Sequence, residues 1–300
     1  MNENTGIPRP ANKVIVYYLY HKMATYIPSP GAPSHTATDP ISLDQFVSTV
    51  RLLVSQHYCC RQDEFTLSFS GITPAYIEAL DEAAGYTDNK AREPADEPSL
   101  RKCHITYSGT SGFLTIKMPS TKQQRLAGGI GGHLIRQMYR MGLQDTVETL
   151  GPVRITSVTQ EGACIEGDMT FLPRPQRQTS QSPSLAIEVG ITQSLPDLHA
   201  AKDRWFDMTP PGGGVNVVLL AKQFATHLRV ECWTRGNPEP SIAEVRQGSG
   251  PSGESDWAWI VTGPVVIPFE PVMIRLKEAG EDDFVLNEDV LVELAERVWM

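Results

Sequence analysis

The chain has 300 residues, a formal net charge of −9, 40% hydrophobic residues and 20% charged residues. Such a length can bury a sizeable core, and the composition is that of a globular protein. The negative charge argues against broad electrostatic attraction to nucleic acid or to anionic membranes, although a local basic groove is compatible with it. No apolar run approaches the roughly 18 residues of a membrane span, so we expect no membrane partner.

Cysteine usage indicates the compartment. The chain has 5 cysteines, an odd number, and no two of them form a CxxC pair. A disulfide framework and a structural zinc site are therefore not expected. We predict an intracellular protein of the cytoplasm or nucleus.

Residues 1–99 are predicted to form an α+β extension that ends in a linker. Apolar residues at helical spacing follow Ser42 over 42–58, and 64–71 alternates like a strand. A second helix is expected over 73–86, where Thr73 precedes a proline at the first helical position. The polar, proline-punctuated segment 87–99 is typical of a linker or a long loop.

Residues 100–235 are predicted to form the core, and residues 236–300 to add strands and a capping helix. The core is expected to run as helix, three strands, helix, strand. Its elements are predicted at 122–142, 153–158, 163–172, 184–191, 195–207 and 215–224. The first helix contains the glycine cluster "AGGIGG", which indicates a close backbone approach.

One carboxylate interrupts an apolar strand. In "SLAIEVGI", Glu188 shares a strand face with Ala186 and Gly190, because successive side chains point to opposite faces. These small neighbours predict a shallow trough beside the Glu188 carboxylate, where a substrate or a metal could approach.

A second carboxylate lies on the preceding strand. In "EGDMTF", Asp168 shares a face with Thr170. If the two strands form a hairpin through 173–183, Asp168 and Glu188 converge, and a bound Mg²⁺ would relieve their repulsion. Such an ion can activate water and neutralise charge on a phosphodiester. Alternatively, each acid lies at a solvent-exposed strand edge.

The motifs "LTIKMPS", "EGDMTFLP", "PSLAIEVGITQS" and "LHAAKDRW" are similar to those of the PD-(D/E)xK nuclease superfamily. Within that superfamily the chain resembles fungal proteins related to the Uma2-type endonucleases. The resemblance covers roughly residues 100 to 235. It implies a restriction-endonuclease-like α/β core and Mg²⁺- or Mn²⁺-dependent hydrolysis of nucleic acid.

The resemblance also implies roles for single residues. Asp168 and Glu188 would be catalytic acids that bind the metal, and the carbonyl of Val189 would be a further ligand. Lys202, or alternatively Lys222, would be the cation that orients the attacking water. The candidate substrate contacts are Gln193, Lys222 and Gln124.

The sequence departs from the superfamily pattern at charged positions. Gly190 stands where the superfamily commonly has lysine, and Ala201 stands where the Uma2-type relatives have it. Gln123 and Gln124 stand where relatives often carry a His-Glu pair. Enzymatic activity therefore stays open. The chain could be an active nuclease, a nuclease fold that has become a binding or scaffold protein, or an unrelated protein-interaction domain in which both acids are incidental.

Overall fold

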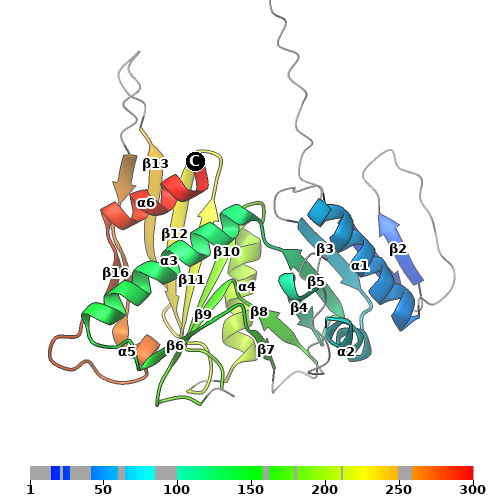
Figure 1. Ribbon diagram of the computed structural model, residues 1–300, viewed down its shortest axis with the longest axis horizontal. Coiled ribbons are helices and arrows are strands. Elements are labelled where there is room, and N and C mark those ends of the chain that lie inside the picture. Colours follow the sequence, from blue (N-terminus) through cyan, green and yellow to red (C-terminus); the bar gives the residue numbers. More distant parts are fainter. Residues whose placement is uncertain are drawn as a thin grey trace, which may run out of the picture.

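The computed structural model describes residues 15–20, 23–27, 42–59, 65–84, 100–157, 162–178, 181–210, 212–248 and 259–299. The fold is mixed α/β, with two large sheets that lie side by side (Figure 1). The first described strand is β1 (Ile15–Tyr20), and the linker expected over 87–99 lies outside the described residues.

The first sheet contains strands that lie between residues 15 and 166. In spatial order its strands are β2 (Met23–Ile27), β1 (Ile15–Tyr20), β3 (Phe65–Ser70), β5 (Phe113–Met118), β4 (His104–Ser108), β8 (Cys164–Glu166) and β7 (Arg154–Thr156). Helices α1 (Leu43–Cys59) and α2 (Pro74–Ala83) cover one face, which buries alternate residues such as Ile105 and Ile116. The intervening residues, which include His104 and Lys117, belong to the opposite face.

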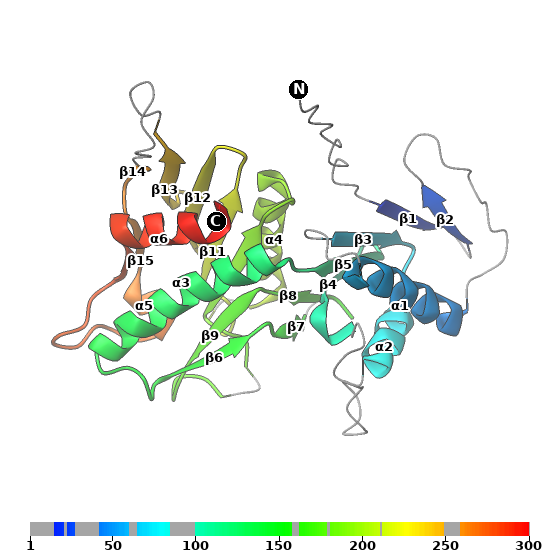
Figure 2. The ribbon, with the colours of Figure 1, turned by 45° about the horizontal axis from the view of Figure 1, so that its top comes forward.

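The second sheet forms the larger core. In spatial order its strands are β14 (Trp259–Thr262), β13 (Ser241–Gln247), β12 (His227–Thr234), β11 (Val217–Gln223), β10 (Leu185–Gly190), β9 (Met169–Pro173) and β6 (Val147–Gly151). Helices α3 (Thr121–Arg140) and α6 (Glu288–Trp299) cover one face, and α4 (Leu195–Met208) covers part of the other (Figure 2). A small pair, β15 (Val265–Ile267) with β16 (Phe284–Leu286), and the short helix α5 (Phe269–Met273) complete this side.

The second sheet follows the expected order of elements only in part, because its first strand after α3 is β6 and not the strand expected at 153–158. After α3, strands β6, β9 and β10 pair in antiparallel fashion, and α4 then connects β10 to the parallel strand β11. The strand expected at 153–158 is present as β7 but belongs to the first sheet, and the single strand expected at 163–172 is wrong. Segment 163–172 divides into β8 and β9, which belong to different sheets.

The chain therefore passes back and forth between the sheets. β6 lies in the second sheet, β7 and β8 lie in the first, and β9 returns to the second. β3 also pairs with β5, so the first sheet spans the boundary predicted at residue 99. Beyond residue 236, β13 and β14 extend the second sheet, and α6 packs against α3.

The close approach expected at the glycine cluster of α3 is found at two of its four positions. A Cβ added at Gly131 would lie 2.0 Å from Sδ of Met169, and one at Gly129 would lie 2.7 Å from Cδ2 of Leu294. An added Cβ at Gly128 or Gly132 would meet nothing within 4 Å. Gly129 and Gly131 thus let α3 pack directly on α6 and β9.

The described residues also bear on membrane spans and on disulfides. None of their helices combines the length and the apolar composition that a membrane span requires. Cys103, Cys164 and Cys232 are buried free thiols, so no disulfide joins them. The side chains of Cys59 and Cys60 lie outside the described residues.

Candidate acid–lysine site

Both predicted acids are buried where the two sheets meet. Glu188 lies in β10, a strand with all six residues buried, and its own exposed fraction is 6%. Asp168 lies in the connection where the chain leaves β8 and enters β9. β9 and β10 form the expected antiparallel pair, and Met169 lies opposite Ile187. The register therefore places Asp168 beside the central part of β10, and its charge acts on Glu188.

The Asp168 carboxylate is surrounded by donors from four elements. Its Oδ1 accepts a hydrogen bond from Nε2 of Gln123 at 2.6 Å and lies 3.2 Å from Nδ1 of His104. Its Oδ2 accepts the backbone N–H of Val189 at 2.6 Å and lies 4.0 Å from Nζ of Lys117. With its side chain only 4% exposed, Asp168 finds its partners inside the protein.

The cation beside the acids is Lys117, on β5 of the first sheet. Its Nζ donates to the carbonyl oxygen of Val189 at 2.9 Å and to Oε1 of Gln193 at 3.4 Å. The Lys117 side chain is 12% exposed. The first sheet thereby supplies the positive charge, and the second sheet supplies the acids and the carbonyl.

Glu188 faces helix α4. Nε1 of Trp205, a fully buried residue, donates to Oε1 of Glu188 at 2.7 Å. The trough expected beside Glu188 is absent because α4 covers it. A Cβ added at Gly190 would lie 2.9 Å from Cδ1 of Leu198. The small residues around Glu188 accommodate a helix.

Burial and neighbouring charges separate the two carboxyl groups. Burial, followed by the charge of Asp168, raises the pKa of Glu188 from 4.5 to about 7. Burial would also raise the pKa of Asp168, but the Lys117 charge and the His104 contact outweigh it and lower that pKa. Burial opposes protonation of His104, yet Asp168 raises the pKa of His104 overall. Near neutral pH Asp168 is therefore ionised, while Glu188 titrates.

These contacts do not suit the divalent ion that the sequence predicts. Mg²⁺ requires oxygen ligands in near-octahedral geometry. Here an ammonium group is bonded to the Val189 carbonyl, and donors already engage both oxygens of Asp168. Oε1 of Gln123 is a buried acceptor without a hydrogen-bond partner, but one neutral oxygen does not replace a carboxylate. Across the described ranges, no three His, Cys, Asp or Glu residues are grouped so as to hold a metal.

Other predicted site residues have different surroundings. The ammonium of Lys202 pairs with Asp203 at 2.6 Å and lies 4.2 Å from the ring centroid of Trp233. Lys222 is 7% exposed and donates to the carbonyl of Ile191 at 2.8 Å. The sequence proposed Lys202 or Lys222 as the cation that orients the attacking water, whereas the lysine in contact with Asp168 is Lys117.

The other predicted substrate contacts, Gln193 and Gln124, also differ in their surroundings. Gln193 contacts Lys117 and so belongs to the site. Gln124 is exposed on α3, whereas its neighbour Gln123 is fully buried and bonds to Asp168. Within the predicted glutamine pair, the inward-facing member is thus Gln123.

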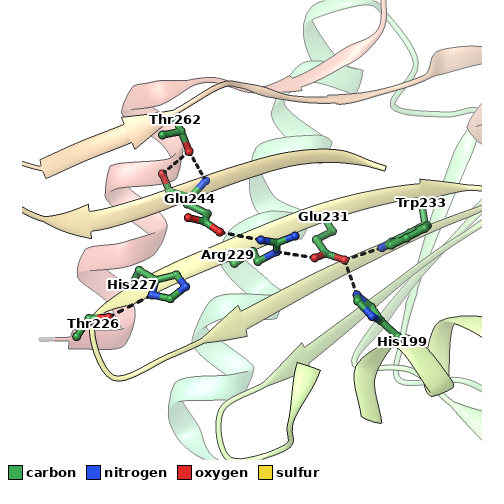
Figure 3. A network of polar contacts seen from close by, with 8 residues as sticks. All are labelled: His199, Thr226, His227, Arg229, Glu231, Trp233, Glu244 and Thr262. Carbon is green, nitrogen blue, oxygen red and sulfur yellow. Dashed lines mark hydrogen bonds and ion pairs between the residues drawn. The ribbon is translucent and has the colours of Figure 1, made fainter. Parts of the chain in front are cut away.

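A further buried carboxylate, outside the site, anchors α4 to the sheet. Glu231, on β12, is 1% exposed and accepts hydrogen bonds from Nε of Arg229, Nε2 of His199 and Nε1 of Trp233, at 2.6 to 2.8 Å (Figure 3). Arg229 extends the network to Glu244 at 2.8 Å. Because His199 lies on α4, this network fixes the helix that carries Trp205 to the site.

Sequence reasoning missed Lys117, His104 and the polar role of Trp205. The alternation in "HITYS" and "FLTIKM" puts His104 and Lys117 on the polar face of their strands, which is the available signal. No local pattern indicates that this polar face meets the second sheet. Trp205 has the apolar spacing of a core residue, which conceals its N–H donor.

The fold and the site define an α/β protein with a closed cluster of two acids and one lysine at the junction of two sheets. The sequence matches no protein-family model and no curated protein.

Proposed function

We propose that the chain is a restriction-endonuclease-like protein that does not cleave nucleic acid and serves as a binding or scaffold protein. The observation that carries this proposal is the bond from Lys117 Nζ to the Val189 carbonyl, beside Asp168. The elements that build the second sheet, α3, β6, β9, β10, α4 and β11, support the restriction-endonuclease-like core, with β7 and β8 inserted between β6 and β9.

The chemistry of the two acids supports the absence of cleavage. Metal-assisted hydrolysis needs an ion with open positions for water and substrate. The Asp168 oxygens are bonded within the protein, and the pKa of Glu188 near 7 leaves that acid partly protonated at neutral pH. Helix α4 closes the face on which Glu188 lies.

The partner class follows from the overall charge. A net charge of −9 disfavours broad contact with the phosphate backbone, so a protein partner is the first expectation. Nucleic acid held in a local groove is the alternative, and salt-dependent binding to labelled DNA or RNA would identify it.

Mg²⁺-dependent cleavage is the second candidate function. The convergence of Asp168, Glu188 and Lys117 favours it, because the resemblance implies two acids and one lysine in the catalytic site. For this function, Lys117 would have to leave the Val189 carbonyl and Asp168 would have to exchange its internal donors for an ion.

A cleavage assay separates the two candidates. The purified chain is incubated with plasmid and single-stranded DNA in Mg²⁺ or Mn²⁺, beside the Asp168→Ala, Glu188→Ala double variant. We expect no cleavage above the level of the double variant. Cleavage by the unchanged chain that disappears in the double variant would establish the nuclease and contradict the proposal.

A further inference from the structure

The ammonium group of Lys117 lies where a metal ion would be expected. It is 2.9 Å from the Val189 carbonyl oxygen and 4.0 Å from Oδ2 of Asp168, two of the oxygens that the sequence assigned to a metal. Its charge also acts on Glu188, the third predicted ligand. Lys117 thus interacts with all three groups.

We propose that Lys117 is a built-in cation that takes the place of a divalent ion, and that its removal opens a divalent-cation site formed by Asp168, Glu188 and the Val189 carbonyl. This inference rests on the proposed function, because it explains why an acid pair of nuclease type would bind no metal.

The charges at the site give the physical reason. Without Lys117, two buried carboxyl groups and a carbonyl would face one another, with His104 beside Asp168 and the charge of Arg204 acting on Glu188 as the remaining cationic partners. Burying unpaired carboxylates is unfavourable, and a divalent ion supplies both the charge and the coordination that they lack. The unpartnered Oε1 of Gln123 adds a buried oxygen beside Asp168.

The test uses a lysine matched in exposure. Lys117 and Lys202 have side chains 12% and 13% exposed, but Lys202 contacts Asp203 and Trp233. Mn²⁺ is titrated by calorimetry into the unchanged chain, Lys117→Met and Lys202→Met. We expect Lys117→Met to bind one Mn²⁺ at least about tenfold more tightly than the other two proteins, a difference of about 1.4 kcal/mol. Binding should disappear when Asp168→Ala is added.

Thermal unfolding provides a second measurement. An ion that binds only the folded chain raises the melting temperature as its concentration rises. Mn²⁺ should therefore raise the melting temperature of Lys117→Met and leave that of Lys202→Met unchanged. If Lys117→Met does not fold, Lys117→Gln takes its place, because its amide can still donate to the Val189 carbonyl.

The Mn²⁺-binding measurements test the role of Lys117, whereas the cleavage assay tests the proposed function. A folded Lys117 variant that binds no Mn²⁺, or an unchanged chain that binds it equally well, would overturn the built-in cation. Nucleic-acid cleavage by the unchanged chain would overturn the proposed function. Equal gains of Mn²⁺ binding in Lys117→Met and Lys202→Met would also contradict the inference, because they would show that the new binding is not at this site.

Discussion

His104 and Lys117 are cross-strand partners on β4 and β5, and both direct a nitrogen atom to the carboxylate of Asp168. One sheet thus supplies two cationic groups to an acid at the start of a strand in the other sheet. Because Asp168 is buried, these contacts and the Val189 N–H stabilise its ionised form.

Removing the charge of Asp168 should strongly destabilise the protein. In Asp168→Asn, Lys117 would be left as a largely buried cation without its acid, and breaking such a pair costs about 3–5 kcal/mol. Urea unfolding at neutral pH measures the change in the free energy of unfolding. The control is Asp203→Asn, whose side chain is 61% exposed and which should change stability by less than about 0.5 kcal/mol. Similar effects in both variants would contradict the buried ion pair.

Glu188 should make stability depend on pH in the direction opposite to that of Asp168. Its pKa is raised from 4.5 to about 7, so the folded state holds a proton that the unfolded state releases. Its contribution is fully present below pH 4.5 and is lost as the pH rises through about 7. In this window the unchanged chain should lose on the order of 2–3 kcal/mol relative to Glu188→Gln. Parallel pH profiles of unfolding in the two proteins would refute the shift.

The Asp168 contribution has the other sign. Its lowered pKa stabilises the folded state above the ordinary pKa of 3.8, and this stabilisation is lost as the pH falls through the folded-state pKa. Acid unfolding of Asp168→Asn should therefore show a weaker pH dependence than that of the unchanged chain.

Trp205→Phe should affect Glu188 specifically. The change retains most of the buried ring but removes the N–H that donates to Glu188 at 2.7 Å. We expect a loss of about 1–3 kcal/mol in the free energy of unfolding and a further rise in the pKa of Glu188. Infrared titration of the carboxyl group measures that pKa. A double-mutant cycle with Glu188→Gln should give a coupling energy of at least about 0.5 kcal/mol, and additivity would argue against the hydrogen bond.

The glycines of α3 offer a matched pair of alanine substitutions. Gly131→Ala places a methyl group where Met169 already lies, so we expect a loss of about 1–3 kcal/mol. Gly132→Ala meets no neighbour within 4 Å and should stabilise the helix by roughly 0.5–1 kcal/mol. Thermal unfolding of both variants measures the difference. Equal shifts would contradict the close packing of α3 on β9.

Elements with a strong periodic pattern can be predicted from the sequence. Elements whose position depends on tertiary contacts cannot. Helices α3 and α4, expected at 122–142 and 195–207, are found at Thr121–Arg140 and Leu195–Met208 because their caps and spacing are local signals. In segment 163–172 the polar residues Glu166 and Asp168 stand where β8 gives way to β9, but local sequence does not indicate that the two strands belong to different sheets.

The C-terminal third shows the same limit. Strand β13 lies within 234–256, a segment whose glycines and prolines are typical of a loop, and α5 lies within the apolar run 264–276, which is typical of a strand. The apolar run around α5 fits either structure by composition. β13 alternates in burial, but the surrounding glycines and prolines conceal its pattern.

The sequence indicates that Asp168 and Glu188 lie on neighbouring strands, but it does not indicate that Lys117 lies beside Asp168. The alternation around Glu188 and Asp168 places both on one strand pair, and β9 and β10 do pair. The position of Lys117 depends on how the first sheet meets the second, which involves residues 72 positions apart in the chain. Local spacing contains no information on such a contact.

The passage of the chain from β6 to β7 and β8, and back to β9, has a consequence for folding. The strands of the two sheets are interleaved along the chain, so a fragment that ends after β5 lacks β7 and β8 of the first sheet and the whole of the second. Calorimetry should accordingly record one cooperative heat-absorption peak, and a protein truncated after β5 should lack the peak entirely.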